Sequence, residues 1–317
     1  MHVFITGGAG FIGSSAAESL LDRGDRVTVL DAFAHGYDKA VKERNASLLE
    51  GRRGFRLVRG DIRDAELLDH LFSSDRPDAV LHMAARTGVR PSLAEPSSYM
   101  DINITGSMRI LEAMRSNGMN RLVFASSSSI YGARQKGPFL ETDTVDRPAS
   151  PYAATKRSGE LLCATWSHLY GTDATCLRFF TVYGPRQRPE MAIHLFADRI
   201  RRGLSIKMFG DGSSARDYTY VDDIVKGVLA AIDRPMGFEI INLGNSHPIR
   251  LDSLIGKIGE ALGEVPQVER HPEQPGDVPI TYADIGKARS LLGYAPETAL
   301  DDGLQAFAAW LRRGGRG

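Results

Sequence analysis

The chain has 317 residues, of which 42% are hydrophobic and 25% are charged, a composition typical of a globular protein. Its 39 basic and 39 acidic residues cancel, so we expect no strongly charged surface for nucleic acids or membranes. The length exceeds what a single hydrophobic core usually supports, which favours two unequal lobes.

The cysteine count and the hydropathy pattern limit the cellular compartments in which we expect this protein. Cys163 and Cys176 are the only cysteines, too few for a disulfide framework and typical of a reducing compartment. Charges interrupt every apolar stretch before about 18 residues, and the N-terminus lacks a basic leader, so we expect neither a transmembrane helix nor a signal peptide. We therefore expect a cytoplasmic protein. The eight scattered histidines predict no metal site.

The first half of the chain alternates short apolar segments with helix-length segments. His2–Thr6 predicts a strand and Phe11–Asp22 a helix, with glycines between them. Further strands are expected at 26–30, 55–59, 79–82, 121–125 and 174–179. This alternation predicts an α/β fold with a doubly wound parallel (Rossmann) sheet.

The pattern changes near Thr181 to an irregular loop, followed by short helices and isolated strands. We therefore expect one domain over residues 1–180 and a smaller mixed α/β lobe over 181–317. Residues 221–232 and 238–243 are apolar enough to return to the first domain, so 217–245 is expected to belong to it.

A glycine-rich turn joins the first strand to the first helix. Gly7, Gly10 and Gly13 would let the backbone turn sharply and approach a pyrophosphate at the helix N-terminus. Asp31 ends the second strand 18 residues after Gly13, where it can bind the adenosine ribose and repel a 2′-phosphate. The spacing predicts NAD rather than its phosphorylated form. A plain turn with a loop-capping aspartate is the competing interpretation.

Residues after later strands extend this cofactor site. Asp61 follows the third strand, where it can reach the adenine amino group, and small residues after the fourth leave room for a flat cofactor. The predicted cofactor contacts are Gly7, Gly10, Phe11, Ile12, Gly13, Asp31, Asp61, Ile62, Ala84, Ala85, Tyr152 and Lys156.

Tyr152 and Lys156 stand four residues apart and share one face if the segment is helical. A free phenol titrates near pH ~10 and is a poor base until positive charge stabilises the phenolate. Lys156 and an oxidised nicotinamide would both supply such charge. Spacing alone fits a surface helix pair equally well. The glycine turn and the serines before Tyr152 favour redox chemistry on a sugar hydroxyl.

Six motifs make the chain resemble the extended short-chain dehydrogenase/reductase family of nucleotide-sugar enzymes, most closely its UDP-glucuronate 4-epimerases. The resemblance covers nearly the whole chain. The motifs are Thr-Gly-Gly-Ala-Gly-Phe-Ile-Gly at 6–13, Ala-Ser-Ser-Ser-Ser-Ile-Tyr-Gly at 125–132, Tyr-Ala-Ala-Thr-Lys at 152–156, Leu-Arg-Phe-Phe-Thr-Val-Tyr-Gly-Pro at 177–185, Arg-Asp-Tyr-Thr-Tyr-Val-Asp-Asp at 216–223 and Gln-Pro-Gly-Asp-Val-Pro at 274–279. The first and third mark only the superfamily.

The resemblance implies that NAD oxidises carbon 4 of the sugar while Tyr152 takes the hydroxyl proton, assisted by Ser127 and Lys156. The 4-keto sugar then turns over and is reduced on its other face, which interconverts UDP-glucuronate and UDP-galacturonate. Similar dehydratases carry Asp-Glu, and decarboxylases a glutamate, where this chain has Ser128 and Ser129, so we expect epimerisation. A 4-epimerase of a neutral UDP-hexose and a non-catalytic NAD-binding scaffold remain as alternatives.

A uronate substrate must keep its carboxylate. Oxidised carbon 4 makes a β-keto acid, which loses carbon dioxide readily when the carboxylate bond stands perpendicular to the carbonyl plane. We expect hydroxyl groups to hold the carboxylate near that plane. They belong to Ser127, Ser128, Ser129 and Thr181.

The nucleotide half of the substrate is expected to meet charged side chains. Arg188 and Arg216 suit the uridine and diphosphate, because guanidinium groups match phosphate oxygens and stack on flat rings. Arg90 is expected in the loop over the diphosphate, and Asp277 on the uridine ribose. Where close relatives often carry Gln-Ala, this chain has Arg86-Thr87, which adds a cation beside the pocket.

These expectations give each lobe a role. Residues 1–180, with 217–245, would bind NAD, and residues 181–317 would bind the nucleotide sugar. Relatives usually dimerise through two helices from each subunit, and the segments around 95–117 and 152–170 are the candidates for a homodimer.

Overall fold

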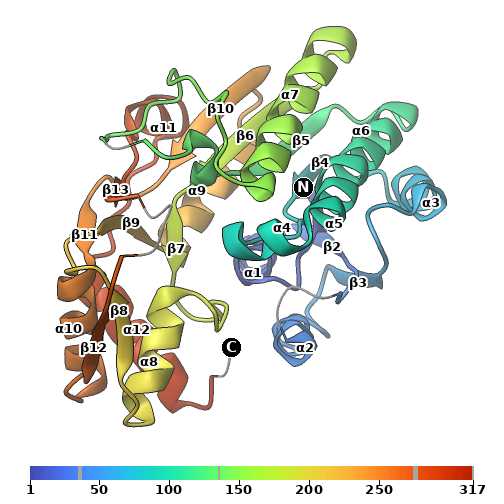
Figure 1. The fold of residues 1–317 in the computed structure, drawn as a ribbon. Coiled ribbons are helices and arrows are strands. Elements are labelled where there is room, and N and C mark those ends of the chain that lie inside the picture. Colours follow the sequence, from blue (N-terminus) through green and yellow to red (C-terminus); the bar gives the residue numbers. More distant parts are fainter. Residues whose placement is uncertain (35–37, 135, 274–277, 316–317) are drawn as a thin grey trace.

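A seven-stranded parallel sheet forms the larger of two lobes in the computed structural model, which describes residues 1–34, 38–134, 136–273 and 278–315 (Figure 1). The strand order is β10-β6-β5-β4-β1-β2-β3, and all neighbours run parallel. The predicted doubly wound Rossmann sheet is therefore confirmed. The strands are β1 (His2–Thr6), β2 (Arg26–Asp31), β3 (Phe55–Arg59), β4 (Ala79–His82), β5 (Arg121–Ser127), β6 (Asp173–Phe179) and β10 (Phe238–Leu243).

Helices cover both faces of this sheet, which explains why its central strands are apolar on both sides. One hydrophobic cluster joins the sheet to α1 (Phe11–Asp22), α9 (Val221–Asp233) and α11 (Gly286–Leu292). A second joins the other face to α3 (Ala65–Asp75), α6 (Gly106–Ser116) and α7 (Pro151–Tyr170). Shorter elements complete the lobe: α2 (Lys39–Ser47), α4 (Val89–Ala94), α5 (Pro96–Met100), a π-helical turn (Asp101–Thr105) and a 3-10 turn (Ser128–Tyr131).

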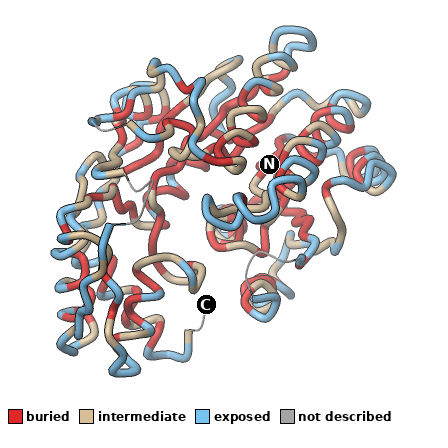
Figure 2. The backbone as a smooth tube through the Cα atoms, in the orientation of Figure 1, coloured by how far each residue is buried: buried red, intermediate tan, exposed pale blue. Residues whose placement is uncertain are grey.

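The smaller lobe has its own core. One sheet contains β7 (Thr181–Tyr183), β9 (Ala215–Tyr220), β11 (Pro248–Arg250) and β13 (Ile280–Thr281), and a second pairs β8 (Ile206–Phe209) with β12 (Val268–His271). Three helices, α8 (Ala192–Arg201), α10 (Leu251–Leu262) and α12 (Leu300–Arg312), pack apolar faces together beside these strands. Figure 2 shows buried backbone in both lobes and exposed outer helical turns. No described helix has the length and apolar character needed to cross a bilayer.

The chain passes between the lobes several times. β9 belongs to the smaller sheet, yet α9 follows it directly and packs against α1, and β10 then pairs with β6. Asp217 on β9 is fully buried, and its carboxylate accepts backbone N–H bonds from Asn245, Ser246 and Ala283. One buried carboxylate thus joins a strand of the smaller lobe to the segments that follow β10 and β13.

Candidate active site

A cavity of about 620 Å³ lies between the lobes at the carboxyl ends of the parallel strands. Such strand ends are where open α/β sheets bind ligands. Every predicted site residue that the structure describes lines this cavity. From the larger lobe they are Gly7, Gly10, Phe11, Ile12, Gly13, Asp31, Asp61, Ile62, Ala84, Ala85, Arg90, Ser127, Ser128, Ser129, Tyr152 and Lys156, and from the smaller lobe Thr181, Arg188 and Arg216. Asp277 lies outside the described residues.

The glycine turn before α1 has the geometry that a pyrophosphate requires. Gly7 has φ +70°, and a Cβ there would stand 2.7 Å from the backbone nitrogen of Ala84. A Cβ on Gly13 would stand 2.5 Å from the carbonyl oxygen of Gly7. α1 starts at Gly10 without a side-chain cap, so its first N–H groups remain for a phosphate. The turn therefore fits the diphosphate of a dinucleotide.

Asp31 lies buried at the end of β2 with its carboxylate firmly held. It accepts hydrogen bonds from the backbone N–H groups of Ala9 (3.1 Å) and Phe33 (2.8 Å). It also accepts one from the Lys42 ammonium at 3.0 Å, a contact that the sequence analysis missed. Lys42 lines the same cavity and offsets part of the negative charge on which discrimination against a 2′-phosphate depends.

Asp61, which follows β3, lines the same cavity. Its carboxylate accepts bonds from the guanidinium (2.7 Å) and the backbone N–H (2.9 Å) of Arg63, and these bonds hold its pKa below the ordinary value. The carboxylate is therefore ionised at neutral pH, as an acceptor for an adenine amino group must be.

The start of α7 fixes Tyr152 at the cavity. Ser150 caps the helix by accepting a bond from the N–H of Ala153 at 3.1 Å, and Pro151 occupies the first turn, as helix starts favour. Tyr152 comes next, with its phenol near enough to the Ser127 side chain for that hydroxyl to lower the pKa of the phenol. The ring of Tyr99 meets the Tyr152 ring edge-on, with centroids 6.2 Å apart.

The acid-base properties of the Tyr-Lys pair differ from the simple expectation. Burial raises the pKa of the Tyr152 phenol, and the Ser127 hydroxyl and the charge of Arg188 counteract part of that rise. Lys156 instead donates to the backbone oxygen of Ala125 at 2.6 Å, and burial lowers its pKa to about 8. Arg188, which the sequence analysis assigned to the nucleotide, thus supplies the cationic influence on the phenol in this structure.

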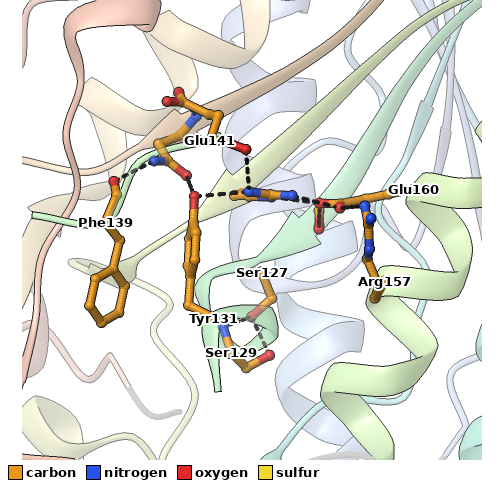
Figure 3. Close-up of polar contacts among 10 residues, drawn as sticks. Ser127, Ser129, Tyr131, Phe139, Glu141, Arg157 and Glu160 are labelled. Atoms are coloured by element: carbon orange, nitrogen blue, oxygen red, sulfur yellow. Dashed lines mark hydrogen bonds and ion pairs between the residues drawn. The ribbon is translucent and has the colours of Figure 1, made fainter. Parts of the chain in front are cut away.

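Ser127 at the end of β5 and Ser129 in the following 3-10 turn lie side by side (Figure 3). Ser127 Oγ accepts hydrogen bonds from the backbone N–H (3.2 Å) and the hydroxyl (3.0 Å) of Ser129. Ser128 lies between them in the 3-10 turn, and Thr181 faces the same cavity from β7. The structure therefore brings together the four hydroxyl groups that the sequence suggested for a carboxylate.

The positively charged residues come from both lobes. Arg188 reaches from the smaller lobe to the hydroxyl of Thr87 and pairs with Glu190 at 3.1 Å. Arg216 on β9 donates to the backbone oxygen of Ala215 at 2.9 Å, and Arg90 lies exposed on α4 at the cavity rim. The sequence analysis missed the Thr87–Arg188 contact, since residues 101 apart in the chain form it.

Arg86, the unusual cation in this loop, is compensated. It pairs with Glu95 at 2.8 Å and lies over the Tyr99 ring, 5.3 Å from its centroid. Asn103 in the π-helical turn holds the loop by accepting from the Arg86 N–H (2.7 Å) and donating to the Arg86 carbonyl (2.9 Å). The extra charge therefore adds less positive potential to the cavity than the sequence suggested.

Residues 3–244 match the model of the NAD dependent epimerase/dehydratase family. The chain belongs to this family. The UDP-glucuronate 4-epimerase of Thermodesulfobacterium geofontis is 43% identical over 98% of this chain and 95% of that protein. UDP-glucuronate 4-epimerase 4 of Arabidopsis thaliana is 44% identical over 97% of this chain and 74% of that protein. The resemblance to nucleotide-sugar epimerases is therefore confirmed.

A solved structure with the same fold carries both ligands. It is the UDP-glucuronic acid 4-epimerase of Bacillus cereus in complex with UDP-glucuronic acid and NAD, which has a TM-score of 0.92, 34% identity and 99% coverage of both chains. The UDP-glucose 4-epimerase of Thermotoga maritima with UDP-glucose has a TM-score of 0.89 and 31% identity, again over 99% of both chains. The family's NAD dependence confirms the predicted cofactor. Among the described residues, no group of side chains suits a metal ion.

The depressed pKa of Lys156 makes a prediction for the cofactor-free protein. The pKa of the Lys156 amine is about 8 in the folded protein and near ~10.4 in an unfolded chain. Between these two pH values the unfolded chain binds one more proton than the folded protein, so the free energy of unfolding rises with pH. Relative to Lys156→Met, the wild type should gain about 2 kcal/mol between about pH 7 and about pH 9.5. Urea denaturation of both proteins measures this difference. A constant difference across that range would contradict it.

Proposed function

We propose that this protein is an NAD-dependent 4-epimerase that interconverts UDP-glucuronate and UDP-galacturonate through a transient 4-keto sugar. One observation carries the proposal. Four hydroxyl groups surround the catalytic end of the cavity, and Asp31 and Asp61 at the adenosine end are the only acidic side chains among the described residues that line it. Elimination of water needs an acid and a base beside the sugar. The four hydroxyls suit epimerisation with the carboxylate retained.

The chain's own residues move and hold the proton. NAD bound in the cavity would supply the acceptor and donor for the hydride of carbon 4. The Tyr152 phenolate takes the proton of the 4-hydroxyl during oxidation and gives it back during reduction. Ser127, which lines the cavity beside Tyr152, orients that phenol and the sugar oxygen. Lys156 holds α7 against the end of β5 through its bond to Ala125.

The two lobes divide the work in this proposal. The larger lobe, over residues 1–180 with α9 and β10, would hold NAD against the glycine turn and Asp31; the expected return of 217–245 is corrected at its start, because β9 through Tyr220 pairs within the smaller sheet. The lobe over residues 181–317 holds the UDP-sugar through Arg188 and Arg216, with Arg90 opposite on the larger lobe, and Asp277 assigned to the uridine ribose. Placement of Arg188 and Arg216 in the cavity supports this division.

The proposal predicts a preference for the uronate substrate. Purified protein should convert UDP-glucuronate to a mixture with UDP-galacturonate without net consumption of NAD. The kcat/KM for UDP-glucose should be at least about tenfold lower, because only the uronate uses the hydroxyl cluster. Product analysis by chromatography or NMR measures both reactions. Faster conversion of UDP-glucose would favour the neutral-hexose alternative instead. No conversion of either sugar would favour the non-catalytic scaffold.

The hydroxyl cluster predicts how the carboxylate survives. Thr181→Ala removes one hydrogen bond to a charged group, a contribution of about 1.5 kcal/mol or more, so carbon dioxide released per epimerisation should rise about tenfold. Thr181→Ser keeps the hydroxyl and should leave that ratio near the wild-type value. An unchanged ratio in Thr181→Ala would reject a role for this side chain in holding the carboxylate.

We also propose a homodimer formed through α5, α6 and α7. Large apolar side chains are exposed on α5 and α7, among them Met100 (38%), Leu161 (52%) and Leu169 (57%). Exposed apolar surface on adjacent helices favours association. Leu161→Glu should shift a dimer to monomer in analytical ultracentrifugation, whereas Leu204→Glu, on the other lobe, should not. A monomeric wild type at micromolar concentration would refute the dimer.

A further inference from the structure

Three residues on one face of α7 lie against the last three residues of β5. Tyr152, Lys156 and Glu160 are spaced by four, so they lie along one side of the helix. Lys156 donates to the carbonyl oxygen of Ala125 at 2.6 Å, and Glu160 accepts from the hydroxyl of Ser126 at 2.6 Å. Tyr152 and the next strand residue, Ser127, line the same cavity. Two hydrogen bonds therefore fix α7 to β5 directly beside the residue that faces Tyr152.

A buried ion pair connects the same helix to the neighbouring strand, β6. Arg178 on β6 lies opposite Ser126 in the parallel ladder. Its guanidinium binds the Glu160 carboxylate twice, with Nε to Oε1 at 2.8 Å and Nη2 to Oε2 at 2.9 Å. Both side chains are at most 1% exposed. One carboxylate on α7 thus joins the ends of β5 and β6.

Arg178 also binds Tyr131, which lies two residues after the serine segment Ser127–Ser129 (Figure 3). Its Nη1 donates to the Tyr131 hydroxyl at 3.0 Å, and that hydroxyl donates to the Asn242 side chain on β10 at 2.7 Å. Ser126 and Tyr131 are therefore tied to one network, and the serines that face the cavity lie between these two fixed points.

Such a network is better suited to fixing geometry than to adding stability. Removing two charges from water carries a penalty that their attraction offsets only in part, and apolar side chains of the same volume often stabilise a core equally well. A forked guanidinium–carboxylate contact does fix direction, because both of its bonds must be made at once.

We propose that the Glu160–Arg178 pair positions Ser127–Ser129 relative to Tyr152, so that the 4-keto sugar is held for reduction instead of being released. This inference deepens the proposed function and rests on it. Neither residue lines the cavity, so both act through the serine segment. Loosening the pair should lower turnover and increase loss of the keto sugar, while binding of the sugar nucleotide is retained.

Two variants test the network from different points. Arg178→Lys keeps the charge and loses the fork, and Tyr131→Phe removes a single hydroxyl. For the full-length protein with NAD, Arg178→Lys should lower kcat at least tenfold with KM within threefold. It should also raise the fraction of enzyme left with reduced cofactor after a fixed number of turnovers, measured by NADH absorbance. Tyr131→Phe should change both quantities in the same direction by a smaller factor.

Two controls separate positioning from folding. Arg157→Gln removes a more exposed partner of Glu160, at 3.2 Å, which does not contact the serine segment, so its kcat and NADH fraction should match the wild type. Phe72→Leu, a substitution on the buried face of α3, should lower the melting temperature without changing the NADH fraction.

The outcomes decide the inference separately from the proposed function. An unchanged NADH fraction in both Arg178→Lys and Tyr131→Phe would overturn it, as would an equal rise in Phe72→Leu. Because NADH accumulates with any sugar oxidised at carbon 4, the test also runs on UDP-glucose if the wild type prefers that substrate. In that case the uronate assignment fails and the positioning role is still tested.

Discussion

Close contact between α7 and the end of β5 is the constraint on which the active site depends. Gly159 makes it possible, because a Cβ at that position would stand 2.2 Å from the ring of buried Phe124. Without a side chain there, the helix lies near enough for the Lys156 amine to reach a β5 carbonyl. The Tyr152 phenol, the Lys156 amine and the Glu160 carboxylate then face the last three residues of β5. Their geometry is a property of the helix–strand packing rather than of a flexible loop.

Charged side chains are unevenly distributed along the cavity wall, although the chain as a whole has no net charge. Asp31 and Asp61 are the only acidic side chains among the described residues that line the cavity, and Asp31 is partly balanced by Lys42. The cationic side chains Arg90, Arg188 and Arg216 line it as well. Such a distribution favours a ligand with an anionic end directed towards the smaller lobe.

The sheet and most of the residues that line the cavity were accessible from the sequence because they follow local rules. Strand periodicity predicted the larger sheet, although β5 continues two residues beyond the expected 121–125, since its serines still pair with β6. The glycine turn likewise follows from spacing. Contacts such as Lys42 with Asp31 and Arg188 with Thr87 depend on side-chain directions in the folded chain, which no local pattern encodes. The Glu160–Arg178 pair was missed for the same reason, as each residue alone resembles an ordinary charged position.

The repeated passage of the chain between the lobes limits how such a protein can change its substrate. The smaller lobe is built from segments that alternate with α9 and β10, so no single stretch of gene encodes it. A contiguous exchange of residues 181–317 would remove the edge strand β10 and the covering helices α9 and α11 of the larger sheet along with the smaller lobe's part of the cavity. New specificity in this architecture must therefore arise by substitution at the cavity wall, within a scaffold that is inherited whole.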